Sequence, residues 1–157
     1  MLDQNTSAQL KTLLERLEGP IELVATLDGS DKSAKIKELV SEVAALSDLV
    51  TARFDGSNKR VPSFGIAKAG EEPRVFFAGL PMGHEFTSLI LALLQTSGYA
   101  PKVSDEVLAN IKSLGVQSNF DVFVSLSCHN CPDVVQALNL IAIYNPVSYT
   151  HLRAHET

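Results

Sequence analysis

The chain has 157 residues, of which 45% are hydrophobic and 20% charged, a composition typical of one globular domain or two small ones. The formal net charge of −5 and the scattered Lys and Arg residues argue against a nucleic-acid-binding surface. Residues 89–94, the longest apolar run, are too short to span a membrane, and residues 1–5 do not resemble a signal peptide. We therefore expect a cytoplasmic protein, in which two closely spaced cysteines are expected to be redox-active, catalytic or metal-binding.

Apolar periodicity and turn residues predict a series of helices and strands along the chain. Leucines at helical spacing are followed by Gly19-Pro20, which ends the first helix. Ser30 or Asp31 can cap the second helix. The predicted elements are a helix over 6–17, a strand over 21–27, a helix over about 31–46, strands over 50–54, 61–67 and 74–78, a helix from 83 to about 98, and an amphipathic segment over 103–114.

A second copy of the opening strand and helix follows. Residues 120–126 have the pattern of residues 21–27, and a shift of 99 residues places Leu27 on Leu126 and Leu39 on Leu138. The order βαβ, then two strands and a helix, is the layout of an α/β thioredoxin-like fold. We therefore expect a complete, cysteine-free first repeat over residues 1–117 and the opening βα unit of a second repeat over residues 118–146. By analogy with that fold, the Val61-Pro62 peptide bond is expected to be cis.

The motif Ser127-Cys128-His129-Asn130-Cys131-Pro132 lies between the predicted strand 122–126 and a predicted helix over 133–143. A cysteine just before a helix meets unpaired N–H groups and the positive end of the helix dipole, which favour the thiolate. Two intervening residues bring the sulfurs within disulfide range, and Pro132 is tolerated near a helix start. The motif predicts that Cys128 is the attacking thiol and Cys131 the resolving one, with His129 and Asn130 setting local charge and geometry.

Two plainer interpretations remain open. The cysteines could be half of a zinc site, but the other two ligands would then have to come from elsewhere in the chain. They could also be buried and inert. A strand that leads directly into a Cys-x-x-Cys motif and a helix favours redox chemistry over both.

Three stretches resemble the N-terminal domain of the F-type subunit of alkyl hydroperoxide reductase, a family with tandem thioredoxin-like folds. They are residues 127–140, residues 21–28 and the Gly83-His84-Glu85-Phe86-Thr87-Ser88-Leu89 stretch, and the likeness runs without a break over residues 1–146. The resemblance implies that electrons pass from NADH to FAD, to a second dithiol and then to Cys128 and Cys131. From there they would go to the disulfide of a peroxiredoxin partner that reduces peroxides. The full-length protein would be a homodimer.

The resemblance also implies that Glu85 lies near the redox pair as a proton acceptor, although an acid at a helix N-terminus needs no such role. His84 is more typical of a surface or capping residue than of a catalyst. The flavin and nicotinamide domains of the family are absent here, and no Gly-x-Gly-x-x-Gly occurs. We therefore expect no cofactor in this chain. The alternative to the relay is a redox-inactive scaffold that offers an interaction surface, because the second thioredoxin-like fold is incomplete.

Residues 147–157 show no periodicity that continues the preceding helix or starts a strand. They resemble the translation of a transposase adapter used in DNA sequencing libraries. We therefore predict that this tail is non-native, and His151 and His155 are excluded from the candidate site.

Overall fold

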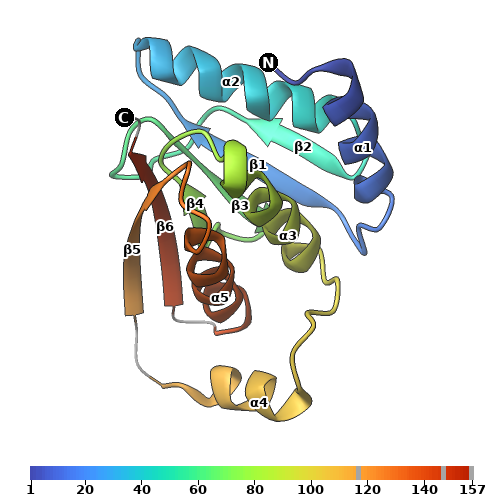
Figure 1. Ribbon diagram of the computed structural model, residues 1–157, viewed down its shortest axis with the longest axis vertical. Coiled ribbons are helices and arrows are strands. Elements are labelled where there is room, and N and C mark those ends of the chain that lie inside the picture. Colours follow the sequence, from blue (N-terminus) through green and yellow to red (C-terminus); the bar gives the residue numbers. More distant parts are fainter. Residues whose placement is uncertain (116–117, 146–147, 156–157) are drawn as a thin grey trace.

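A computed structural model describes residues 1–115, 118–145 and 148–155, apart from the side chains of 148–151 and 153–155. The described residues form a mixture of helices and strands, including a run of three strands that is followed by a run of helices (Figure 1). In order they are α1 (Gln4–Leu14), β1 (Ile21–Thr26), α2 (Asp31–Ala45), β2 (Val50–Arg53), β3 (Ser63–Lys68), β4 (Val75–Phe77), the 3-10 turn η1 (Gly83–Glu85), α3 (Phe86–Thr96), α4 (Asp105–Ser113), β5 (Ser118–Ser125), α5 (Cys131–Tyr144) and β6 (Ser148–His155).

Local sequence signals explain most of these boundaries. Three helices begin with a side-chain cap that accepts a hydrogen bond from a backbone N–H of the first turn. The caps are Asp3 for α1, Ser30 for α2 and Ser104 for α4. The predicted helices and strands of residues 1–115 are confirmed to within a few residues, and the Val61-Pro62 bond is cis. The largest shift concerns the first helix, which ends at Leu14 because the chain turns toward Gly19-Pro20 earlier than the leucine pattern indicates.

Six strands form one sheet in the order β2-β1-β3-β4-β6-β5. In the first repeat, β1 pairs in parallel with β2 and antiparallel with β3, which in turn pairs antiparallel with β4. Strand β6 joins the repeats, since it pairs in parallel with both β4 and β5. The two repeats therefore share one continuous sheet.

The strand pairing reproduces the repeat that the sequence predicts. In the first repeat, Ile21 of β1 lies opposite Val50 of β2, and helix α2 connects the two strands. In the second, Phe120 of β5 lies opposite Thr150 of β6, and α5 connects them. Both units are parallel βαβ crossovers, so the strand that ends at the cysteine motif occupies the position that β1 has in the first repeat.

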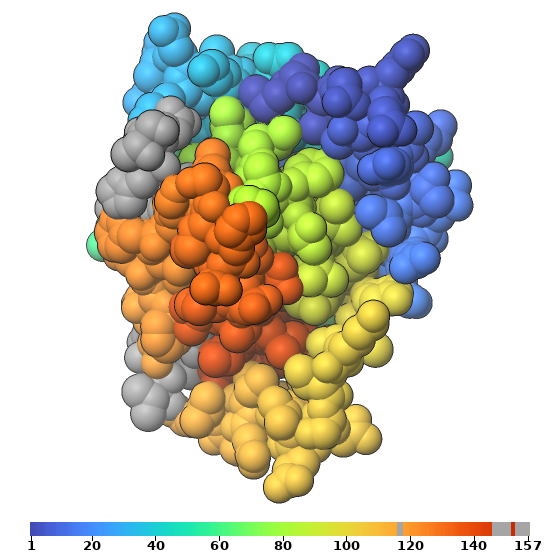
Figure 2. All heavy atoms as spheres, in the orientation of Figure 1, coloured from blue at the N-terminus to red at the C-terminus, as the bar shows by residue number. Residues whose placement is uncertain are grey.

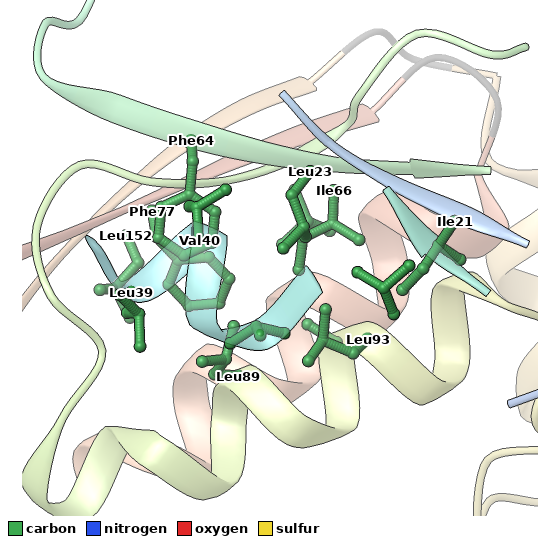
Figure 3. Close-up of a cluster of buried hydrophobic side chains, with 14 of the residues drawn as sticks. Ile21, Leu23, Leu39, Val40, Phe64, Ile66, Phe77, Leu89, Leu93 and Leu152 are labelled. Carbon is green, nitrogen blue, oxygen red and sulfur yellow. The ribbon is translucent and has the colours of Figure 1, made fainter. Parts of the chain in front are cut away.

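A single core lies between the sheet and the helices. Alternate residues of β1 are buried, and their side chains meet those of α2 and α3 (Figure 3). The Phe64 and Phe77 rings stack with their centroids 5.3 Å apart. Leu152 of β6 lies beside Phe77 in this cluster and is 1% exposed, so the second repeat contributes to the same core.

The sequence pattern predicted no strand in residues 147–157, and the structure differs, because Ser148–His155 form β6. The physical reason is the sheet position: backbone hydrogen bonds to β4 and β5 stabilise a strand there without a regular apolar alternation. The Ala78 N–H, for example, donates to the Leu152 carbonyl at 2.7 Å. A backbone pairing accepts most sequences, so the adapter origin of this segment stays a prediction.

Helix α4 stands apart from the sheet and contacts α5 (Figure 1). The buried side chain of Asn145, just after α5, donates from Nδ2 to the carbonyls of Ile111 at 2.9 Å and Leu114 at 2.8 Å. This amide satisfies the C-terminal carbonyls of α4 and fixes the end of α4 against the end of α5.

Candidate functional site

The cysteine motif occupies the turn between β5 and α5, as the sequence predicts. Strand β5 ends at Ser125, and the Cys128 N–H donates to the Ser125 carbonyl at 3.0 Å. Cys128 and Cys131 form a disulfide with their Cα atoms 5.5 Å apart, within the usual range for such a bond. The helix begins at Cys131, two residues earlier than predicted, because Pro132 is favoured in the first turn.

The two cysteines differ in their surroundings. Both are half-buried, but Cys131 packs against the hydrophobic core as the first residue of α5, whereas Cys128 lies in the turn before it. His129 and Asn130 between them are exposed, and Asn130 precedes the helix without forming a side-chain cap. The N-terminus of α5 therefore has no side-chain cap from Asn130, and its dipole favours negative charge at the motif.

The first repeat contributes the other side of the site through η1. The His84 N–H donates to the Leu126 carbonyl at 3.3 Å, and the His84 ring lies 4.4 Å from the ring of His129, tilted by 57°. Gly83 has φ +59°, and a Cβ added there would lie 3.0 Å from the Leu126 oxygen. This close packing is visible in Figure 2, where the orange surface of the motif and α5 lies against the yellow-green surface of η1 and α3.

Glu85, the last residue of η1, is completely buried. Neither of its carboxylate oxygens has a hydrogen-bond partner among the described residues. Burial raises the pKa of the Glu85 carboxyl above its ordinary value, while the nearby Ser88 hydroxyl and the His84 imidazole act in the opposite direction. A buried carboxyl with a raised pKa exchanges protons nearer neutral pH than an exposed one does.

Lys and Arg are absent from residues 75–101, which contain η1 and α3, and from residues 113–152, which contain β5 and α5. Two histidines of these segments, His84 and His129, contact each other through their rings.

Sequence reasoning located the cysteines correctly and assigned His84 to the surface. The structure shows that His84 is exposed, yet it contacts the motif across the two repeats. The Gly83-His84-Glu85 stretch before α3 predicts a turn with exposed polar side chains. It does not predict which part of the molecule those side chains contact. The complete burial of Glu85 had no local signal.

The sequence contains no Gly-x-Gly-x-x-Gly turn, the element that holds the pyrophosphate of FAD or NADH in dinucleotide-binding folds. Among the described residues, no group of three or more His, Cys, Asp or Glu side chains is arranged to hold a metal ion. The same residues include no helix with the length and apolarity needed to cross a membrane.

Similar proteins are found by sequence, although no family model matches the chain. The F-type subunit of alkyl hydroperoxide reductase from Escherichia coli K12 is 54% identical over 147 residues, and that from Pseudomonas putida is 53% identical over 146 residues. Each match covers 93% of this chain but 28% of the relative, so the chain spans little more than a quarter of the length of these relatives.

Similar folds are found among solved structures as well. The NTD_N/C domain of alkylhydroperoxide reductase AhpF from Enterococcus faecalis superposes with a TM-score of 0.87 at 26% identity, covering 99% of this chain and 80% of that one. A protein disulfide oxidoreductase from Aeropyrum pernix shares the fold, with a TM-score of 0.78 at 20% identity over 96% of this chain and 76% of that one. In sequence and in fold, the chain corresponds to the N-terminal region of the F-type subunit of alkyl hydroperoxide reductase, built from thioredoxin-like repeats.

Proposed function

We propose that this chain is a dithiol–disulfide electron relay in which Cys128 and Cys131 cycle between disulfide and dithiol. The observation that carries the proposal is the Cys128–Cys131 pair itself, formed across the turn that leads from β5 into the N-terminus of α5. A helix N-terminus lowers the pKa of a nearby thiol and so raises its thiolate fraction at neutral pH.

The exchange with a partner disulfide proceeds in two steps. The Cys128 thiolate attacks one partner sulfur, so the partner S–S bond breaks, a mixed disulfide forms and one partner thiolate leaves. The Cys131 thiolate then attacks the Cys128 sulfur, which re-forms the Cys128–Cys131 disulfide and releases the second partner thiolate. Two electrons pass to the partner, and the two protons of the dithiol balance the two new partner thiols. Cys131 suits the resolving role because it is fixed at the first turn of α5.

Glu85 would act as a proton acceptor for a thiol of the pair. Support comes from its position in η1, next to His84, whose ring contacts the motif, and from its buried carboxylate without a hydrogen-bond partner among the described residues. Burial raises the pKa of Glu85, so this carboxyl takes up a proton more readily than an exposed one.

We extend the proposal to the source and destination of the electrons, and the likeness to the F-type subunit supports this extension. We assign the supply of electrons to the flavin- and NADH-binding part that the resemblance implies for longer family members. The recipient would be the peroxiredoxin of the same system, and peroxide reduction would be the overall reaction. We assign Cys128, Cys131 and Glu85 the catalytic roles, with His129, Asn130 and Pro132 shaping the motif.

Mixed-disulfide trapping tests this proposal on the 157-residue chain. The reduced Cys131→Ser variant, mixed with an oxidised peroxiredoxin of this system, is expected to accumulate a covalent complex because Cys128 attacks but cannot be resolved. The Cys128→Ser variant is the matched control and should trap at least about tenfold more slowly, since the remaining thiol packs against the core. Non-reducing gels and intact mass measure the complex.

The alternatives predict other outcomes. A redox-inactive scaffold would form no covalent complex with either variant, although the chain could still bind the peroxiredoxin noncovalently. A zinc module would carry stoichiometric metal after purification in the reduced state. Either result would overturn the relay.

A further inference from the structure

We propose that Ser88 and Gln136 are positioning residues for Glu85: the Gln136 amide holds the Ser88 hydroxyl so that its O–H can donate to the Glu85 carboxylate. The inference rests on the proton-acceptor role of Glu85 in the proposed relay. It connects a side chain of α5, the helix that begins at Cys131, to the buried acid of the first repeat.

A side-chain hydrogen bond joins α3 to α5 close to Glu85. The Nε2 atom of Gln136 donates to the Ser88 Oγ at 3.3 Å. Ser88 is completely buried, and Gln136, five residues after Cys131, is half-buried. An amide N–H group can donate but not accept, so the Ser88 oxygen is the acceptor and the hydroxyl proton stays available for another partner.

Glu85 is the partner that this proton can reach. Ser88 follows Glu85 by three residues, a spacing at which side chains on a helix surface are neighbours. Neither Glu85 carboxylate oxygen has a hydrogen-bond partner among the described residues, so both can accept. Burial raises the pKa of Glu85, and the Ser88 hydroxyl is the largest influence in the opposite direction. A hydroxyl that donates to a carboxylate favours its ionised form, so Ser88 limits the rise that burial causes.

Other ionisable groups lie on the elements that pack around Glu85. The turn η1 packs against α3, which has no ionisable side chain, and against α5. The ionisable side chains of η1, the cysteine turn and α5, apart from Glu85, are His84, Cys128, His129, Cys131, Asp133 and Tyr144. His84 lowers the pKa of Glu85 as well, but less than Ser88 does. Because changes at Ser88 and Gln136 leave all of these groups in place, their effects cancel when the variants are compared with the parent.

The test measures the pKa of Glu85 in the 157-residue chain with the Cys128–Cys131 disulfide intact, so that neither cysteine titrates. The NMR resonance of the Glu85 carboxyl carbon, identified by its loss in Glu85→Gln, is followed against pH. Ser88→Ala should raise this pKa by about 0.5–1 unit, because the carboxylate loses its donor. Gln136→Met keeps the length of the side chain without an N–H and should raise the pKa by a smaller amount.

Two comparisons make the result specific. Gln95→Met makes the same change at another half-buried glutamine, which lines the same pocket as Gln136 but lies at the far end of α3, and it should leave the pKa of Glu85 unchanged. In a Ser88→Ala background, Gln136→Met should have no further effect, since Gln136 acts through Ser88. Far-UV circular dichroism establishes that each variant is folded.

The sign of the Gln136→Met effect tests the direction of the hydrogen bond. If Gln136 accepted the Ser88 proton through its Oε1, this variant would release the hydroxyl and lower the pKa of Glu85, which would contradict the inference. An unchanged pKa in Ser88→Ala or in Gln136→Met would contradict it too. So would a Gln136→Met effect that persists in full without Ser88.

These outcomes are separate from those of the relay. The measurement involves no thiol exchange, so mixed-disulfide trapping alone decides whether Cys128 and Cys131 act as a relay. If Glu85 of the parent titrates at the ordinary carboxyl pKa, both its proton-acceptor role and this inference are wrong, whatever the trapping shows.

Discussion

Glu85 combines complete burial with an ionisable group that has no hydrogen-bond partner among the described residues. Because burial raises its pKa, the folded protein holds a proton on this carboxyl at pH values where the unfolded chain has released it. The contribution of Glu85 to stability is therefore present below the ordinary carboxyl pKa of about 4.5 and is lost as the pH rises through the raised value.

Glu85→Gln should remove the loss of stability that the Glu85 carboxyl causes as the pH rises. We expect the variant and the parent to have similar melting temperatures near pH 4, and the variant to become more stable relative to the parent as the pH rises to about 8. Thermal unfolding followed by circular dichroism at several pH values measures the difference.

Glu42 is the control with the opposite sign. The N-terminal ammonium and the Leu2 N–H donate to its carboxylate, and these bonds lower the pKa of Glu42. Its contribution is present above the ordinary carboxyl pKa and is lost as the pH falls, so Glu42→Gln should cost stability near pH 7 and little near pH 3. If Glu85→Gln, like Glu42→Gln, lowered the stability near pH 7 more than near pH 3, the burial of the Glu85 carboxyl would be contradicted.

Gly83 gives a second prediction at this scale. Alanine at φ +59° costs about 1–2 kcal/mol in backbone strain, and its Cβ would also press on the Leu126 oxygen. Gly70→Ala, with φ +85° and open space, should cost the strain alone, and Gly29→Ala should change stability by less than about 0.5 kcal/mol. Urea denaturation measures the free energy of unfolding of the three variants. Equal losses for Gly83→Ala and Gly29→Ala would show that η1 does not pack on the motif.

At the scale of the elements, α3 is the helix that both repeats use. It packs on β3 of the first repeat and on α5 of the second, and Leu93 near its centre is fully buried. Helix α4, in contrast, touches α5 from outside the core, and its Val107 is 44% exposed. The motif is therefore positioned by α3 rather than by α4.

Truncations in these two helices should differ accordingly. Leu93→Ala is expected to cost about 2–5 kcal/mol because it leaves a cavity in the shared core. Val107→Ala should change stability by less than about 0.5 kcal/mol, since it lies on the surface of a helix. Denaturant unfolding compares them, and a cost above about 2 kcal/mol for Val107→Ala would place α4 in the core.

The elements themselves could be predicted because their signals are local. The Ser30 cap, the apolar spacing of α2 and the strand pattern of residues 21–27 each depend on neighbours in the chain, and each was confirmed. The disulfide-range spacing of Cys128 and Cys131 is local as well. The contact between His84 and His129 and the burial of Glu85 depend on how two repeats meet, which no single segment encodes.

At the scale of the whole molecule, one sheet connects the repeats through β6, which lies between β4 and β5. The apolar pattern did not predict β6, because the pattern of residues 147–157 is weak. A central strand is also stabilised by backbone hydrogen bonds to a neighbouring strand on each side, which do not depend on that pattern. Leu152 supplies the buried contact that the pattern did not reveal.

Removal of residues 146–157 tests the place of β6. In the full chain, the Ala78 N–H is bonded to Leu152 and should exchange slowly with deuterium; in the shortened chain it should exchange at least about tenfold faster. Amides of β1, which pairs with β2 and β3, should keep their protection and serve as the internal control. Unchanged exchange at Ala78 would show that β6 does not occupy this position in solution.

The central claim is that Cys128 and Cys131 form a reversible dithiol–disulfide couple. Equilibration of the chain in glutathione buffers of graded potential, followed by acid quenching and mass counting of alkylated thiols, measures this couple directly. We predict one two-electron transition between zero and two labels, with a midpoint between about −120 and −270 mV, the range of catalytic dithiols. A midpoint potential below about −300 mV, or two thiols that never form a disulfide, would contradict a reversible relay couple.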